Sequence, residues 1–142
     1  MREILFRGKT YEGEWVEGSL ITEGKNCGII EVDHDDIIPN MINRDTYLNW
    51  SHGDIDGVVS IVDPITVGQF TGMFDKDGKK IFEGDIVQYN VHSHSECLVD
   101  FVRQVVYKDG RFIPMSVFSV SWKPKIVGNV YDNKELLYKK EG

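Results

Sequence analysis

The chain has 142 residues, of which 41% are hydrophobic, and a formal net charge of −7. This length and composition allow one domain or two small lobes with a real core, and they exclude an intrinsically disordered chain. No uninterrupted apolar run exceeds three residues, which excludes a membrane-spanning helix and a secretory signal. We therefore expect a cytoplasmic protein without a membrane partner.

The negative charge is concentrated in the first half of the sequence. Residues 1–70 carry 5 Lys and Arg and 13 Asp and Glu, a balance of −8, whereas residues 71–142 carry 11 and 10, a balance of +1. An acidic half repels a phosphate backbone, so nucleic acid is an unlikely partner. Cys27 and Cys97 are interpreted as small buried apolar groups without a disulfide, because the cytoplasm keeps thiols reduced.

The first elements predicted are short β-strands. Alternation of apolar and polar residues indicates strands over residues 2–7, 14–21 and 27–32. Turn residues separate these strands at short intervals, which favours an antiparallel meander. Within the second strand, the pattern predicts that Trp15 lies on the buried face.

Residues 33–57 show neither the helical nor the strand period and are predicted to form an irregular loop. Aromatic side chains on exposed loops are frequent anchors of protein interfaces. Tyr47, Trp50 and His52 are therefore the predicted contacts for a protein partner or for a second copy of the chain. The alternative is that Tyr47 and Trp50 fill the core of the first lobe.

The second half reads as strands joined by tight turns. A strand over residues 58–62 is expected to end at Asp63-Pro64. Asp77-Gly78 and Asp109-Gly110 each lie between apolar runs and predict two β-hairpins, because glycine takes a positive φ without strain. Further strands are predicted over 67–70, 85–91, 98–107, 116–122 and 125–131, and a helical turn capped by Asp132 or Asn133 over 134–137. The expected core residues are Trp15, Phe82, Ile86, Val99, Phe101 and Phe118.

Two groups of residues could carry chemistry. His92, His94 and Cys97 are weak candidate zinc ligands that lack a nearby second pair, with Cys27 or His34 as the possible fourth ligand. We expect no metal, no other cofactor and no catalytic residue. A metal-dependent enzyme that uses His92, His94 and a carboxylate is one alternative function.

The other group mixes aromatic rings with positive charge in the second half. Such a mixture can stack on and neutralise single-stranded nucleic acid. A nucleic-acid-binding module on the C-terminal lobe is therefore a second alternative function. Its candidate residues are Tyr107, Arg111, Trp122, Lys123 and Lys125.

Three parts of the sequence resemble the YopX family of phage and prophage proteins. The central part contains Gln-Phe-Thr-Gly at 69–72, Asp-Lys-Asp-Gly-Lys at 75–79 and Ile-Phe-Glu-Gly-Asp-Ile-Val at 81–87. The beginning of the chain at 2–16 and its last strand and turn at 127–137 also resemble the family, except that Lys134 stands where proline is expected. The resemblance implies a YopX-like fold and a phage or prophage origin, and it carries no established activity.

These observations predict a mainly β protein with minor short helices. Residues 1–65 would form a small N-terminal meander sheet, and residues 66–142 a small C-terminal barrel of the Src-homology type. We predict a phage- or prophage-encoded accessory protein that binds a host or phage protein or associates with itself. Enzymatic activity is left open, with a non-enzymatic role favoured.

Overall fold

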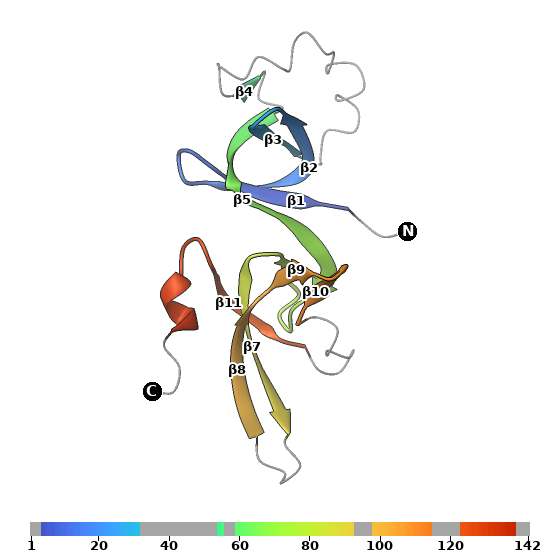
Figure 1. The fold of residues 1–142 in the computed structure, drawn as a ribbon, viewed down its shortest axis with the longest axis vertical. Helices are drawn as coiled ribbons and strands as arrows, with labels where there is room; N and C mark the ends of the chain where they lie inside the picture. Colours follow the sequence, from blue (N-terminus) through green and yellow to red (C-terminus); the bar gives the residue numbers. More distant parts are fainter. Residues whose placement is uncertain (1–3, 32–53, 56–58, 93–97, 115–122, 139–142) are drawn as a thin grey trace. The chain divides into compact units, whose positions relative to one another are not determined.

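The computed structural model describes residues 4–31, 54–55, 59–92, 98–114 and 123–138. Within these residues the chain consists of β-strands and one short 3-10 helix, so the mainly β prediction is confirmed (Figure 1). The chain divides into two compact units, residues 1–69 and 70–142. The predicted division lay between residues 65 and 66. No helix in the described ranges has the length and apolarity needed to cross a membrane.

The first unit is one antiparallel sheet. The strands are paired in the order β1-β2-β3-β5-β4, and β1 also pairs with β5. The predicted meander β1-β2-β3 is therefore present, and the second pairing of β1 closes a ring of paired strands. Closure leaves β1, β2, β3 and β5 without an open edge over the paired residues. The strands are β1 (Phe6–Thr10), β2 (Trp15–Glu23), β3 (Asn26–Glu31), β4 (Asp54–Ile55) and β5 (Val59–Phe74).

The core of this unit forms inside that ring. Val16, Ile29 and Val62 are buried together, and partly buried apolar side chains from β1 to β5 pack against them. A side chain at Gly8 would place its Cβ 2.7 Å from Cγ2 of Val62. The close approach of β1 to β5 therefore requires glycine at this position.

Trp15 lies on the opposite face from the one predicted. Val16 faces the core, whereas Trp15 is half-buried on the outer face of the sheet. There the guanidinium carbon of Arg7 lies 4.8 Å from the centre of the indole ring. The alternation of faces along this strand was predicted correctly. The assignment of Trp15 to the buried face was wrong, because the cationic side chains of Arg7 and Lys9 beside the indole ring stabilise it outside the core.

β5 continues through Pro64, where the sequence predicted a break. The pairing with β1 shifts between Arg7↔Gly68 and Lys9↔Asp63, so residues 64–67 bulge opposite a single residue of β1. Proline is tolerated there because a bulged residue donates no hydrogen bond to the ladder. The Thr66 hydroxyl fills the gap, accepting the Lys9 amide at 2.8 Å and donating to the Asp63 carbonyl at 2.6 Å.

The second unit contains the remaining strands, and both predicted Asp-Gly hairpins are confirmed. β5 pairs with β6, β9 pairs with β10, and β7 lies between β11 and β8. Closure of these strands into a Src-homology-type barrel stays a prediction, and the predicted strand at 116–122 lies outside the described residues. The elements are β6 (Lys80–Phe82), β7 (Asp85–His92), β8 (Leu98–Gln104), β9 (Val106–Lys108), β10 (Arg111–Ile113), β11 (Lys125–Asn129) and η3 (Lys134–Leu137).

The core of the second unit is built from β6, β7 and the junction of β8 with β9. Ile81, Val87 and Val105 are buried at its centre. Phe82 and Ile86 are buried as predicted, whereas Phe101 is only half-buried. The side chains of Val99 and Phe118 lie outside the described part of the chain.

A buried carboxylate organises the first hairpin of this unit. Asp75 is 1% exposed, and its Oδ1 accepts the amides of Asp77 at 2.9 Å and Lys79 at 2.8 Å. Its Oδ2 accepts the amide of Ile126 at 3.2 Å. The amide of Lys76 also donates to the carbonyl of Pro124 at 2.9 Å. The turn between β5 and β6 is thereby joined to the start of β11, about fifty residues later.

These hydrogen bonds determine the charge state of Asp75. Burial alone would raise the pKa of its carboxyl group. The amides of Lys79, Ile126 and Asp77 and the positive charge of Lys79 outweigh burial, so the pKa lies below the ordinary value. Asp75 is therefore an anion that serves as a structural hydrogen-bond acceptor.

The segment that follows β11 is held by a network of asparagine side chains. Oδ1 of Asn129 accepts the amides of Tyr131 and Asp132, at 3.0 and 2.9 Å. Oδ1 of Asn133 accepts the amide of Asn129 at 3.2 Å. The predicted helical turn over 134–137 is present, but the Asn133 side chain makes no hydrogen bond to η3 and turns back toward β11 instead.

The backbone conformation of Asn133 fits a lysine rather than a proline at position 134. A residue that precedes proline is restricted to ψ of about +120° to +160°. Asn133 has φ −134° and ψ 38°. Proline would therefore strain Asn133, although position 134 is the first residue of η3 and such positions often accept proline.

We predict that Lys134→Pro destabilises the protein by more than about 1 kcal/mol, because the native backbone is incompatible with proline at this position. The free energy of unfolding in urea measures the effect. Lys134→Ala is the matched control and should change stability by at most about 0.5 kcal/mol, because the side chain is exposed. A stabilising Lys134→Pro substitution would contradict the prediction.

We also predict that Asp75→Asn lowers the free energy of unfolding by about 1–3 kcal/mol at neutral pH, because the amide cannot accept from all three donors. The pKa of Asp75 is lowered by folding, so its stabilisation is present above the ordinary aspartate pKa and is lost as the pH falls through the folded-state pKa. The gap between wild type and variant should close in acid. Exposed Asp77, changed to Asn, is the control, and a pH-independent gap would refute this role.

Candidate binding surface

Most of the predicted site residues lie outside the described part of the chain. His34, Tyr47, Trp50 and His52 belong to residues 32–53, and His94 and Cys97 belong to residues 93–97. The predictions made for these six residues stay predictions.

The remaining predicted ligands lie in different units of the described chain. His92 is the last residue of β7, and its side chain is not described. Cys27 is a half-buried free thiol in β3, and burial raises its pKa. Across the described ranges, no group of three or more His, Cys, Asp or Glu side chains is placed to hold a metal ion.

The candidate nucleic-acid residues are divided between elements. Tyr107 and Arg111 lie in the β9–β10 hairpin, and Lys125 begins β11. Tyr107 is paired with Phe112, whereas Arg111 is paired with Lys108, so Tyr107 and Arg111 point to opposite faces of the hairpin. The described residues therefore do not combine these two side chains in one stack. Trp122 lies outside the described residues.

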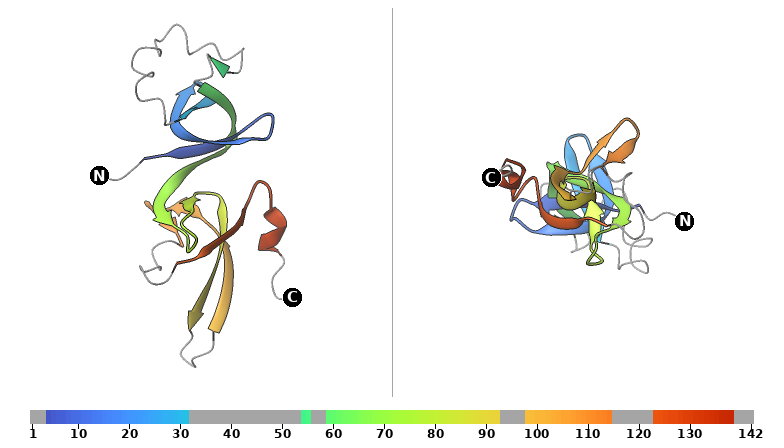
Figure 2. Two further views of the ribbon diagram at one scale, coloured as in Figure 1. Left: turned by 180° about the vertical axis from the view of Figure 1, so that it is seen from behind. Right: turned by 90° about the horizontal axis from the view of Figure 1, so that it is seen from below.

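A clustered surface lies on the hairpin formed by β7 and β8. The distal halves of the two strands extend beyond the other labelled strands of this unit (Figures 1 and 2). Their register places Tyr89 directly opposite Phe101 and Val87 directly opposite Arg103. Directly opposed residues share a face. The face of the hairpin that carries the buried Val87 therefore also carries aromatic and cationic side chains.

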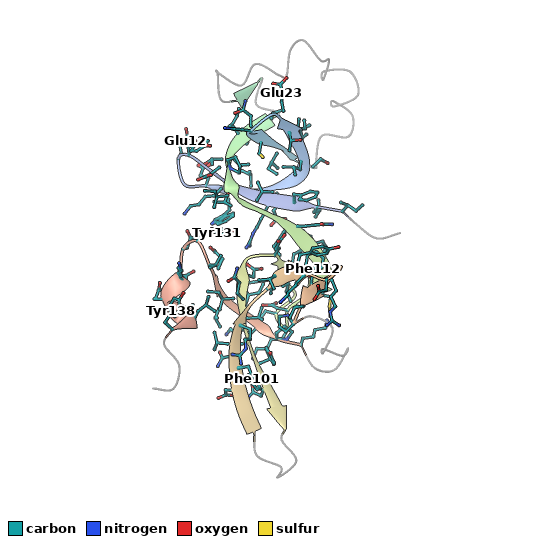
Figure 3. The ribbon with its side chains drawn as sticks, viewed as in Figure 1. Glu12, Glu23, Phe101, Phe112, Tyr131 and Tyr138 are labelled. Carbon is teal, nitrogen blue, oxygen red and sulfur yellow. The ribbon has the colours of Figure 1, made fainter. Side chains whose placement is uncertain are left out.

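We name Tyr89, Phe101 and Arg103 the arm cluster. The rings of Tyr89 and Phe101 are stacked, with centroids 5.4 Å apart and an interplanar angle of 23°. The guanidinium carbon of Arg103 lies 4.8 Å from the centre of the Phe101 ring. Both rings are half-buried, Arg103 is exposed, and Figure 3 labels Phe101 on the hairpin. Burial raises the pKa of Tyr89, and the positive charge of Arg103 opposes that rise.

Arg103 is held in place by two contacts. Besides the ring of Phe101, its Nη1 donates a hydrogen bond to the carbonyl of Val102 at 3.0 Å. A guanidinium has five N–H donors in a rigid planar fork, so these contacts orient the group and leave donors facing solvent. The group is thereby prepared to bind a carboxylate in a bidentate manner.

The opposite face of the same hairpin carries exposed polar groups beside the half-buried Val102. Gln88, Asn90 and Asp100 are exposed there, and Asn90 is paired directly with Asp100. The hairpin is therefore amphipathic, with its rings on one face and its neutral and acidic groups on the other. Stacked rings beside an oriented cation are typical of the energetic centre of a protein interface.

The arm cluster was only partly visible in the sequence. Phe101 was assigned to the core because it alternates with Val99 and Val105, and Tyr89 was not singled out. The signal was the pattern of Tyr89 with Phe101 and Arg103, but it depends on the register of two strands. The sequence that connects the two strands contains no tight-turn signature from which that register could be derived.

The comparisons with known proteins agree with the resemblance seen in the sequence. The family model described as "YopX protein" matches residues 5–138, which covers both units. No curated protein matches the sequence.

Proposed function

The chain belongs to the YopX family, and we propose that it is a non-enzymatic module that binds another protein through the arm cluster. The observation that supports this role is the oriented guanidinium of Arg103 beside the stacked rings of Tyr89 and Phe101. Tyrosine and arginine are enriched among the residues that dominate binding energy in protein interfaces.

The geometry of the cluster favours a protein segment that carries a carboxylate beside an apolar side chain. The carboxylate would accept from Arg103, and the apolar group would lie on the exposed edges of the two rings. The contacts of Arg103 with Phe101 and Val102 reduce the entropy lost when a partner binds. The polar opposite face keeps the rest of the hairpin compatible with water.

The biological setting follows from the family resemblance. We propose a phage- or prophage-encoded accessory protein that acts in the cytoplasm of a bacterial host. The partner would be a host or phage protein. The irregular region that contains Tyr47 and Trp50 stays a second predicted contact. The metal-dependent enzyme and the nucleic-acid module stay alternatives, and no described cluster favours them over the arm cluster.

The proposal is tested by affinity capture from a bacterial host lysate followed by calorimetry with each purified candidate. Arg103→Gln keeps much of the aliphatic stem but removes the charge and the planar fork. We expect it to weaken binding at least about thirtyfold, which is the effect of losing an interface hot spot. Tyr89→Ala should weaken binding as well, provided that its thermal unfolding shows a folded protein.

Asn90→Ala is the matched control, because it changes the opposite face of the same hairpin and should leave the affinity unchanged. A captured protein that binds wild type, Arg103→Gln and Tyr89→Ala equally well would refute the arm cluster as the binding surface. Binding lost equally in the Asn90→Ala control would show that the hairpin acts through its backbone or its stability.

A further inference from the structure

The turn between β1 and β2 forms an acidic tip. Tyr11, Glu12 and Glu14 are exposed there, and the Tyr11 side chain is 69% exposed. Gly13 has a φ of +99°, and Gly13 and Thr10 are joined by a backbone hydrogen bond, so the turn is compact. Figure 3 labels Glu12 at this tip. We call Tyr11, Glu12 and Glu14 the acidic tip.

The turn between β9 and β10 forms a basic tip of similar design. Lys108 and Arg111 are exposed and directly opposite one another, on either side of Asp109 and Gly110. Both turn residues have positive φ, 56° and 79°, which is typical of a rigid two-residue hairpin turn. Tyr107 is 55% exposed. We call Tyr107, Lys108 and Arg111 the basic tip, and note that the Asp109 carboxylate lies within it.

The basic tip is unfavourable for the isolated hairpin. Like charges directly opposite each other destabilise a pair of antiparallel strands. In the described part of the chain, the side chains of Lys108 and Arg111 make no ion pair or hydrogen bond. Tyr107 is held edge-to-face against Phe112, with ring centroids 5.0 Å apart, and Phe112 packs against the core. The tip thus presents two cations on one face of the hairpin, while the ring of Tyr107 anchors the other face.

The acidic tip offers the complementary groups. Glu12 and Glu14 also make no side-chain ion pair or hydrogen bond with another described residue. Each tip therefore carries two like charges and one exposed tyrosine, and the signs of the charges are opposite. Exposed aromatic rings of this kind are commonly desolvated in protein contacts.

We propose that the chain associates with itself head to tail, with the acidic tip of one copy bound to the basic tip of a second copy. Glu12 and Glu14 would pair with Lys108 and Arg111 on one face of the β9–β10 hairpin, and Tyr107 lies on the other face. A contact between different surfaces repeats along a chain of copies or closes into a ring. This association uses neither the arm cluster nor any step of the proposed function, so the two can fail independently.

The strength of the association is limited by its size. Two hairpin tips bury less area than a standard interface of about 1,600 Å², so the contact belongs with weak, reversible associations. The net charge of −7 makes copies repel at long range. At physiological ionic strength the screening length is about 8 Å, so the charges at the tips decide the contact.

Sedimentation velocity of the full chain over a range of protein concentrations tests the proposal. We expect the average mass to rise with concentration at about 0.1 M salt and to return toward the monomer at about 1 M, where screening shortens to about 3 Å. Lys108→Glu/Arg111→Glu should weaken the association at least about tenfold, and Glu12→Lys/Glu14→Lys should do the same.

The mixture of the two variants is the decisive measurement. One variant has two acidic tips and the other has two basic tips, so each alone should remain monomeric. Mixed in equal amounts, they should form a complex, because the acidic tips of one fit the basic tips of the other. Lys76→Glu/Lys134→Glu is the matched control, since it reverses two exposed cations elsewhere in the second unit and should associate like wild type.

Each outcome decides for or against the proposal. Wild type that stays monomeric at every concentration overturns it, as does a mixture that fails to associate. Self-association that survives in both tip variants also overturns the assignment of the contact to the two tips, because another surface must then form it. A thermal unfolding transition retained in each variant shows that any loss arises from the contact. Lys108→Glu alone should keep or raise the melting temperature, because it removes the like-charge pair.

Discussion

The second unit depends on the buried carboxylate of Asp75. Asp75 accepts amides from two residues of its own turn and from Ile126 at the start of β11. A charged group buried without such donors would be strongly destabilising, whereas one with three donors fixes the position of each. The hairpin that begins the unit and the strand that ends it are therefore positioned by the same side chain. β7 lies beside β11, so the arm cluster rests on this framework.

The residues that carry the family resemblance are used to build the fold. Thr71 donates to the Ile81 carbonyl at 2.8 Å, and Oδ2 of Asp85 accepts the amide of Phe82 at 2.8 Å. Gly72, Gly78 and Gly84 all have positive φ. The side chains of Thr71, Asp75 and Asp85 each have a structural partner in this unit, so these residues build the fold and carry no chemistry of their own. Function has to be sought in side chains that the fold leaves exposed.

Tight turns were predictable from the sequence because a local rule determines them. Asp77-Gly78 needs a positive φ at Gly78 alone, Asp109-Gly110 has one at both residues, and both hairpins are present. The assignment of faces was less predictable, since Trp15 lies outside the core through a contact with Arg7 on the neighbouring strand. The course of β5 through Pro64 depends on a bulge that only the register with β1 reveals. The arm cluster likewise required the pairing of Tyr89 with Phe101.

Exposed groups bind well only when their own structure is fixed. Arg103 is oriented by an aromatic ring and a carbonyl, and Lys108 and Arg111 are set by a turn in which both central residues have positive φ. In both cases a rigid strand pair beneath the charge reduces the entropy lost on binding. A lysine at position 103 would keep the charge but lose the planar fork and much of its stacking on Phe101. In the proposed binding roles, the arrangement of these side chains would select for partner geometry as well as for charge, which a solubilising surface does not require.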